Sequence, residues 1–325
     1  MASYLVTGAA GFIASRVVEM LLADGHSVYG VDNLCDAYDV RMKAYRLKRL
    51  LAMPGFKFQK LDISKRGCIE ELTGFVEDAA AVINLAAWSG VRSSLIDPWA
   101  YIDTNTTGTL NLLEFCKTQG ISKFILASTS SLYGNENELP YKETSGTDHP
   151  LQPYAASKKG AEVMAYAYHH LFDIDVTVFR YFTVYGPAGR PEMVMFRFCQ
   201  WIAEGREVTV TGDGEQSRGF TYLDDIARGT ILGLKPVGYE IFNLGGHEVA
   251  TINQLITMFE TCLGRTAEKK YVPFHPADVL TNVADVTKAG EMLGWEPQVG
   301  LEEGVTRLVN WYLQERDWVK DIATP

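Results

Sequence analysis

The sequence is poor in cysteine and histidine, and both shortages limit what the protein can be. Its 325 residues include five cysteines, which are scattered, odd in number and without a C-x-x-C pair. This usage argues against a disulfide framework and is typical of reduced, mostly buried thiols in a cytoplasmic protein. The six histidines show no spacing that suits metal ligands, so we expect neither a metal site nor histidine catalysis.

Long hydrophobic runs and positive charge are also scarce. No stretch approaches the roughly 18 uninterrupted apolar residues of a membrane span, so we expect no membrane partner. The N-terminus lacks a basic segment before its apolar stretch, and we expect no signal peptide. The 30 basic against 40 acidic residues give a net charge of −10, which disfavours nucleic acid as a partner. Small anionic ligands remain compatible, because local groups create such sites.

The N-terminal segment has the order of a dinucleotide-binding unit. An apolar run at 4–6 leads into TGAAGFI at 7–13, an apolar helical stretch, a second apolar run and then Asp32. Gly8 permits a tight turn, and Gly11 lets the backbone approach a pyrophosphate at the helix N-terminus. Asp32 can accept hydrogen bonds from ribose hydroxyls and repels a 2′-phosphate, which favours NAD over NADP. The spacing is G-x-x-G-x-x-A rather than G-x-G-x-x-G, so a glycine turn of another α/β protein is the alternative.

Strands and helices continue to alternate beyond this unit. Apolar runs at 56–62, 81–87, 123–128 and 176–181 read as strands, and residues 100–118 and 155–172 read as helices. This alternation predicts an α/β fold, a Rossmann-type doubly wound parallel sheet with a smaller C-terminal substrate-binding domain. We place the first domain at 1–186 and the second mainly at 187–325, with part of the later chain returning to the sheet.

Tyr154 and Lys158 stand four residues apart on the predicted helix and therefore share one face. A nearby ammonium lowers the pKa of a phenol from about 10, which would let Tyr154 shuttle protons near neutral pH. Such a pair is more often surface decoration, so it is a weak signal alone. Hydroxyl side chains at 128–131 fall at the carboxyl edge of the sheet, where they either bind a ligand or cap a helix.

Taken together, these segments resemble the extended short-chain dehydrogenase/reductases, and within them the nucleotide-sugar epimerases. The resemblance covers nearly the whole chain and rests on TGAAGFI at 7–13, LAA at 85–87, STSSLYG at 128–134, PYAASK at 153–158, RYFTVYGP at 180–187 and GDG at 212–214. The segments VRSS at 91–94 and FTVYGPAGRPEM at 182–193 look most like UDP-glucuronate 4-epimerases. Neutral-sugar epimerases usually carry Asn where this chain has Thr183.

The resemblance implies roles for individual residues, an NAD cofactor and a UDP-sugar substrate. Thr129, Tyr154 and Lys158 would form the catalytic triad. The cofactor would contact Gly8, Gly11, Phe12, Ile13, Asp32, Asn33, Asp62, Ile63, Leu85, Ala86, Ala87, Asn105, Tyr154 and Lys158. The substrate would contact Arg92, Ser130, Ser131, Thr183, Arg190, Arg218 and Asp278. Two departures fall in the substrate region, since Gly219 replaces a usual Asp and Ala277 replaces a usual Gly.

The implied reaction is 4-epimerisation of a UDP-hexuronate. Tyr154 would take the C4 hydroxyl proton while the C4 hydride passes to NAD, and the 4-keto sugar would turn over before the hydride returns. A neutral UDP-hexose or UDP-N-acetylhexosamine 4-epimerase is the alternative of the same class. A non-catalytic NAD- or nucleotide-binding protein is the alternative of another class. The resemblance and the widely apolar helices at 100–118 and 155–172 also lead us to expect a homodimer.

Epimerisation of a uronate requires that its carboxylate be protected from decarboxylation, and the resemblance implies a set of side chains suited to this. A ketone at C4 lies β to the carboxylate, and β-keto acids lose CO2 readily. Thr129, Ser130, Ser131 and Thr183 would hold the anion with hydroxyls alone. Related decarboxylases carry Glu at position 131, and related 4,6-dehydratases carry Asp-Glu at 130–131, so we expect neither of these activities.

Overall fold

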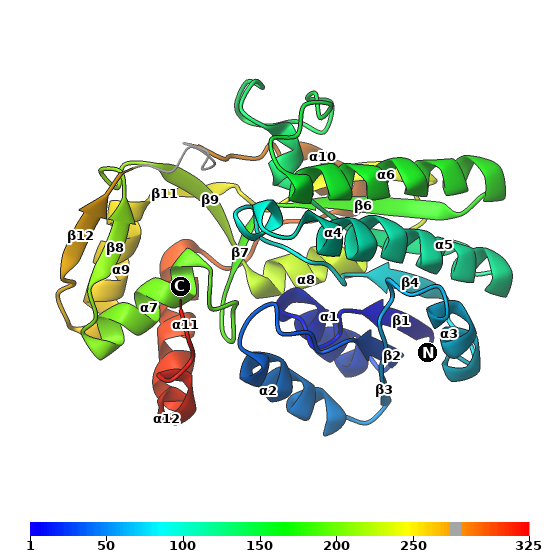
Figure 1. Ribbon diagram of the computed structural model, residues 1–325, viewed down its shortest axis with the longest axis horizontal. Helices are drawn as coiled ribbons and strands as arrows, with labels where there is room; N and C mark the ends of the chain where they lie inside the picture. Colours follow the sequence, from blue (N-terminus) through cyan, green and yellow to red (C-terminus); the bar gives the residue numbers. More distant parts are fainter. Residues whose placement is uncertain (274–280, 325) are drawn as a thin grey trace.

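The computed structural model describes residues 1–273 and 281–324, and a parallel sheet of seven strands lies at its centre (Figure 1). The order is β10-β6-β5-β4-β1-β2-β3, the order of a doubly wound nucleotide-binding sheet. The strands are β1 Ser3–Thr7, β2 Ser27–Asp32, β3 Phe56–Lys60, β4 Ala81–Asn84, β5 Lys123–Thr129, β6 Asp175–Tyr181 and β10 Tyr239–Leu244. The late strand β10 pairs with β6, so the chain returns to the sheet after residue 187.

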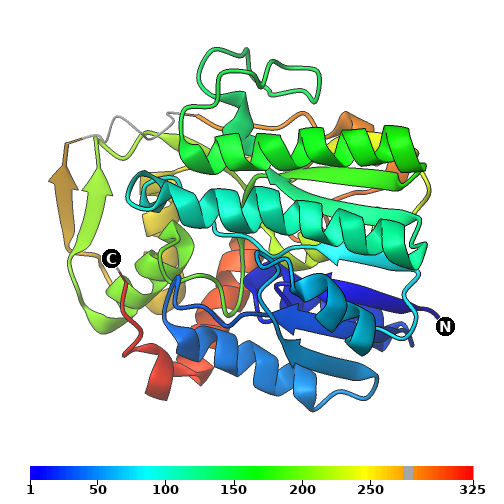
Figure 2. The ribbon, with the colours of Figure 1, turned by 45° about the vertical axis from the view of Figure 1, so that its right-hand side comes forward.

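Helices cover both faces of this sheet. Figures 1 and 2 show α5 (Gly108–Gln119) and α6 (Pro153–Phe172) side by side along one face. The apolar core on that face also includes α3 (Cys68–Phe75), whereas the core on the opposite face includes α1 (Phe12–Ala23), α8 (Leu223–Leu232) and α10 (Thr287–Leu293). Successive strand residues alternate between the two cores, as a pleated strand requires. The strands are therefore hydrophobic on both faces, which is typical of parallel sheets.

The predicted helix at 100–118 is interrupted. It consists of α4 (Pro98–Tyr101), a π-helical segment η2 (Ile102–Thr107) and then α5. The side chain of Asn105 donates to the Trp88 carbonyl and to the Ser157 hydroxyl, and Thr106 bonds the Ser157 carbonyl. These contacts tie the widened turns to α6 and to the loop after β4. Such π-bulges often mark functional sites.

The rest of the chain forms a second, smaller assembly around its own aromatic core. It contains a three-stranded sheet of β7 (Thr183–Tyr185), β9 (Ser217–Tyr222) and β11 (Glu248–Thr251), and a pair formed by β8 (Val208–Thr211) and β12 (Lys269–Val272). Its helices are α7 Val194–Glu204, α9 Ile252–Leu263, α11 Leu301–Gln314 and α12 Arg316–Val319. Buried residues such as Phe196, Phe259 and Tyr312 fill the space between them.

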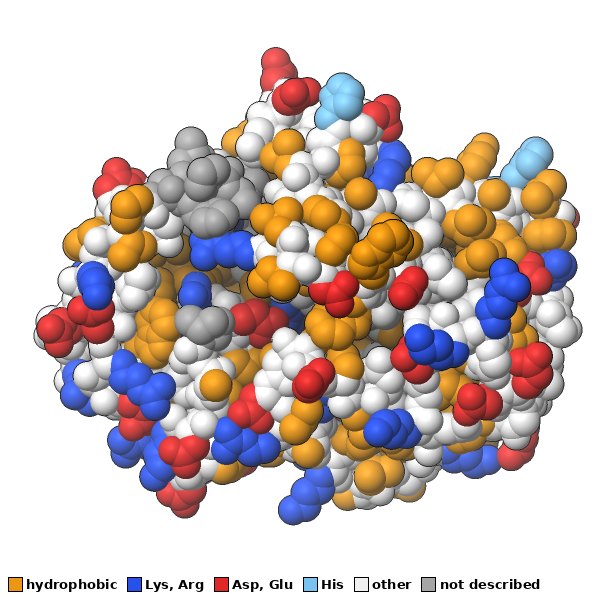
Figure 3. Space-filling view, viewed as in Figure 1, with side chains coloured by type: hydrophobic (Ala, Val, Ile, Leu, Met, Phe, Trp, Pro, Cys, Tyr) orange, Lys and Arg blue, Asp and Glu red, His pale blue; other side chains and the backbone are white. Residues whose placement is uncertain are grey.

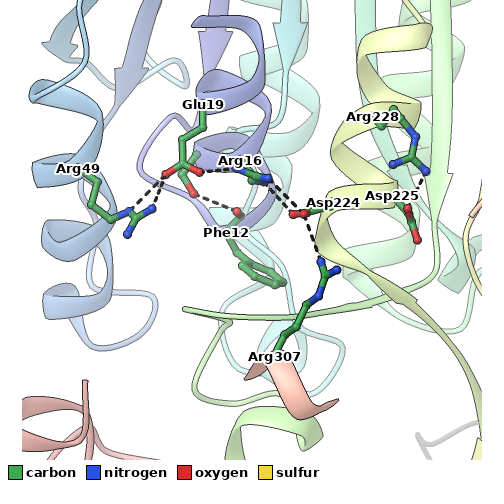
Figure 4. Close-up of polar contacts among 9 residues, drawn as sticks. Phe12, Arg16, Glu19, Arg49, Asp224, Asp225, Arg228 and Arg307 are labelled. Carbon is green, nitrogen blue, oxygen red and sulfur yellow. Dashed lines mark hydrogen bonds and ion pairs between the residues drawn. The ribbon is translucent and has the colours of Figure 1, made fainter. Parts of the chain in front are cut away.

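Ion pairs hold α1 against its neighbours, and one pair reaches the smaller assembly (Figure 4). Arg16 on α1 binds Asp224 on α8 at 2.8 Å, and Arg307 on α11 approaches the same carboxylate at 3.9 Å. Glu19 on α1 accepts from Arg49 on α2 (Val40–Leu51) at 3.2 Å. Each half-exposed pair contributes little alone, but together they connect α1 to α2 and α8, and α8 to α11.

Candidate active site

A cavity of about 440 Å³ lies at the carboxyl edge of the central sheet, beside the point where β1 separates β2 from β4. This is the switch point at which doubly wound folds bind ligands. Most predicted site residues line it: Gly8, Gly11, Phe12, Ile13, Asp32, Asn33, Asp62, Ile63, Leu85, Ala86, Ala87, Thr129, Ser130, Ser131, Tyr154, Lys158, Thr183, Arg190 and Arg218. Segments up to about two hundred residues apart in the chain therefore meet in one place.

The turn before α1 is shaped for close approach of a phosphate. Gly8 has a positive φ of 66°, and a Cβ there would meet the Ala86 Cα at 2.8 Å. A Cβ on Gly11 would meet the Gly8 carbonyl oxygen at 2.7 Å. No acidic side chain occupies the first turn of α1, so its free N–H groups and dipole favour an anion. This cradle fits the pyrophosphate of a dinucleotide.

Asp32 lies where an adenosine ribose is expected. Its carboxylate is buried and accepts from the backbone N–H groups of Ala10 at 3.2 Å and Leu34 at 2.8 Å. The Lys43 ammonium approaches the same carboxylate at 3.4 Å and the Cys35 thiol at 3.3 Å. Sequence reasoning missed Lys43, which lies eleven residues beyond Asp32 on a helix without a recognisable motif. A carboxylate has about four acceptor sites and three are occupied here, so Asp32 retains capacity for one ribose hydroxyl.

The predicted triad meets at the opposite end of the cavity. Thr129 ends β5, and its hydroxyl hydrogen bonds with the half-buried phenol of Tyr154 at the start of α6. The Lys158 ammonium, one turn further along α6, donates to the Ala127 carbonyl at 2.9 Å. Burial lowers the pKa of Lys158 to about 8, although Glu162 opposes this shift. An ammonium has three donors, so Lys158 can also bind a ligand.

The direction expected for the pKa of Tyr154 was wrong. Burial raises it, while the hydrogen bond with Thr129 and the charge of Arg190 act against burial without reversing it. Lys158 is not among the groups that shift this pKa, because its ammonium is directed to the Ala127 carbonyl. Helical spacing places two residues on one face, but it carries no information about burial. The spacing of Tyr154 and Lys158 alone therefore does not lower the pKa of Tyr154.

Hydroxyl groups line the wall beside the triad. Thr129 accepts from the Ser131 backbone N–H at 3.2 Å, and Asn282 donates from Nδ2 to the Ser130 hydroxyl at 3.1 Å. Sequence reasoning missed Asn282, which comes from the C-terminal part of the chain. It also missed Glu192, which lines the cavity and pairs with Arg190. The guanidinium neutralises this carboxylate.

Two predicted site residues do not line the cavity, and a third lies outside the described residues. Asn105 is buried behind the cavity wall, where its amide binds the Trp88 backbone at 3.0 and 2.9 Å and the Ser157 hydroxyl. Arg92 is exposed at the start of the 3₁₀ turn η1 (Ser93–Leu95) and does not line the cavity. Asp278 falls outside the described residues. Gly219, the departure beside Arg218, leaves no space for a Cβ, which would overlap the Gly246 backbone.

Across residues 1–273 and 281–324, no group of three or more His, Cys, Asp or Glu side chains could hold a metal ion. Within the same residues, no helix has both the length and the apolar character that crossing a membrane demands.

Comparisons with known proteins agree with this geometry. The chain belongs to the NAD dependent epimerase/dehydratase family, whose model matches residues 4–245. It is 52% identical over 323 residues to a UDP-glucuronate 4-epimerase of Thermodesulfobacterium geofontis, covering 99% of each chain.

Solved structures give the same result. The UDP-glucuronic acid 4-epimerase of Bacillus cereus, in complex with UDP-glucuronic acid and NAD, superposes with a TM-score of 0.89 at 35% identity, covering 96% of this chain and 99% of that one. The UDP-glucose 4-epimerase of Thermotoga maritima, with UDP-glucose, also reaches 0.89 at 33% identity, covering 97% and 99%. The predicted Rossmann-type fold, epimerase family and NAD dependence are confirmed.

Proposed function

We propose that this protein catalyses the NAD-dependent interconversion of UDP-glucuronate and UDP-galacturonate by epimerisation at C4. The observation that carries the proposal is the wall of hydroxyl groups beside Tyr154, in which Thr129, Ser130 and Ser131 line one cavity with Thr183. The 52% identity to a UDP-glucuronate 4-epimerase supports the same substrate.

The chain's own residues account for binding and proton transfer. The turn at Gly8 and Gly11 would hold the pyrophosphate of NAD, and Asp32 would hold its adenosine ribose. When bound, NAD would supply an acceptor for the hydride at C4 of the sugar and would return it to the opposite face of the sugar ring. Tyr154 exchanges the C4 hydroxyl proton, and Thr129 orients that hydroxyl through its contact with the phenol. Loss of the hydride from C4 is thus coupled to removal of the proton from the oxygen attached to C4.

Lys158 contributes its charge. Below about pH 8 its ammonium is protonated, and once it is within reach of a bound substrate and Tyr154 it would favour the phenolate that forms when Tyr154 gives up its proton. As the pH rises through that value, this stabilisation is lost. The reaction is therefore expected to slow on the alkaline side.

The substrate carboxylate needs protection from decarboxylation. Hydroxyl donors bind an anion through hydrogen bonds and add no negative charge that would repel it. Ser130 accepts a hydrogen bond from Asn282, so its own hydrogen is available for donation to the substrate. The carboxylate of Glu192, which also lines the cavity, is paired with Arg190. These contacts favour retention of the substrate's carboxylate through the 4-keto stage.

The test is incubation of the purified protein with UDP-glucuronate, followed by NMR of the products and a CO2 assay. UDP-galacturonate with little UDP-pentose is the expected result. A UDP-pentose as main product, or faster conversion of UDP-glucose than of UDP-glucuronate, would contradict the proposal. Bound NAD without turnover of any UDP-sugar would instead favour a non-catalytic binding protein.

We also propose a homodimer formed by α5, α6 and the π-helical segment. One face of α6, including Ala161 and Ala165, is buried against the sheet, whereas Val163 and Tyr166 are more than half exposed on the other. Ile102 is exposed beside them, and Figure 3 shows hydrophobic side chains gathered over this region. Two copies could bury this surface against each other.

Light scattering at micromolar concentration should give twice the mass of the 36.1 kDa chain. Val163→Glu places a charge in the proposed interface and should give a monomer. Lys65→Glu, on the exposed connection between β3 and α3, is the matched control and should leave the dimer intact. A monomeric parent protein would contradict the proposal.

A further inference from the structure

A buried ion pair lies directly beneath the triad. The Arg180 guanidinium on β6 binds both oxygens of Glu162 on α6, at 3.0 and 2.9 Å, and each side chain is only 3% exposed. Two charges so far from water are costly unless they are paired in good geometry. This pair satisfies that condition, because its two hydrogen bonds are parallel and bidentate.

The pair is connected to the reacting end of the cavity in two ways. The Ser128 hydroxyl, next to Thr129 at the end of β5, donates to Glu162 at 2.6 Å. Glu162 also follows Lys158 by one helical turn, and its negative charge opposes the loss of the Lys158 proton. One carboxylate therefore contacts the strand end that carries Thr129 and influences the ammonium that supports Tyr154.

Other titratable groups around this cluster have partners of their own. They come from several elements: Tyr133 in the 3₁₀ turn η3 (Ser130–Tyr133), Tyr154 on α6, Tyr239 on β10, and Glu143 in the connection before α6. Tyr133 accepts from Arg180 at 3.1 Å, and Glu143 accepts from the Asn243 backbone at 2.8 Å. Glu162 is the anion next along the helix to Lys158.

We infer that Glu162, held in place by its bidentate pairing with Arg180, is a positioning residue that supports the charge of Lys158 and fixes the strand end that bears Thr129. Arg180 fixes the orientation of the carboxylate through two hydrogen bonds, and the carboxylate then acts on Lys158 and Ser128. The inference rests on the proposed function, since it assigns Lys158 a charge that the proposed epimerisation requires.

Strands β5 and β6, which carry Ser128 and Arg180, also provide a matched control. At their opposite end, Lys123 on β5 pairs with Asp175 on β6, and this pair is also largely buried. Asp175→Asn removes a carboxylate from a similar buried pair, but far from the cavity. It reproduces the structural cost of the change without its effect on Lys158.

The first experiment needs no substrate. Competitive labelling with acetic anhydride, read by mass spectrometry of the Lys158 peptide, gives the pKa of this amine in the full-length protein. The parent is expected near the value of about 8 that burial imposes. Glu162→Gln should lower it by about one unit, because an opposite charge is lost. Asp175→Asn should leave it unchanged. An unchanged value in Glu162→Gln would overturn the inference.

The second experiment measures the pH dependence of epimerisation by the NAD-loaded enzyme. With a pKa lowered by about one unit, the charged fraction of Lys158 at pH 8 falls from about one half to about one tenth. Glu162→Gln should then lose about fivefold in kcat at pH 8 relative to the parent, and much less near pH 6. A uniform loss at every pH would mean that Glu162 is structural only, and it would contradict the inference.

A double variant covers the case in which Glu162→Gln does not fold. Glu162→Gln with Arg180→Met leaves no unpaired buried charge, and such replacements are often tolerated. Its Lys158 pKa must also fall, and an unchanged value in the folded double variant would overturn the inference. If the Lys158 pKa falls in the variants but neither they nor the parent protein turn over a UDP-sugar, the effect of Glu162 on Lys158 stands. Only the proposed function is then refuted.

Discussion

Replacement of Tyr154 by Phe isolates the proton shuttle from everything else that the residue does. The aromatic ring packs edge-on against Tyr101, with centroids 6.0 Å apart, and Phe keeps that contact. Only the hydroxyl and its hydrogen bond with Thr129 are lost. General acid–base catalysis contributes about 10²–10⁴-fold. The barrier should therefore rise by about 2.7–5.4 kcal/mol, with the loss in kcat rather than in binding.

The assay is conversion of UDP-glucuronate at saturating substrate, followed by NMR. Binding of NAD and of UDP, measured by calorimetry, should stay within about twofold of the parent values. Tyr271→Phe, the same substitution at an exposed position of β12, is the control and should leave kcat unchanged. Near-parental turnover by Tyr154→Phe would refute the assignment of Tyr154 as the shuttle. Lost cofactor binding would show that the residue acts mainly in binding.

Two further predictions concern the sugar end of the cavity. Ser130→Ala or Thr183→Val should raise the KM for UDP-glucuronate roughly tenfold, since each removes one hydrogen bond to an anion, and should increase the fraction of UDP-pentose seen by NMR. Unchanged KM and product ratio would argue that these hydroxyls only order the loop. Gly219→Ala should lower the free energy of unfolding by about 1–3 kcal/mol in urea titrations, because its Cβ would overlap the Gly246 backbone. Gly74→Ala, at an open helical position, should not destabilise the protein.

The cofactor half of the site was largely predictable from the sequence because local chain geometry builds it. The turn at Gly8, the helix that follows and the strand ending at Asp32 are consecutive, and each has a short-range signal. Lys43 was missed because its approach to Asp32 depends on how α2 packs. The same limit explains the wrong direction for the pKa of Tyr154. The shift is set by burial in the assembled protein, which a spacing of four residues does not reveal.

The sugar half depends on contacts that no local pattern encodes, and Gly219 shows how they are linked. Its backbone N–H donates to the Asn282 carbonyl at 2.8 Å, and the Asn282 side chain donates to Ser130 at 3.1 Å. A side chain at position 219 would displace the Gly246 backbone or β9 itself, because no space separates them. The absence of a side chain at position 219 therefore affects the cavity through Asn282. It influences how Ser130 contacts the substrate as well as how β9 packs.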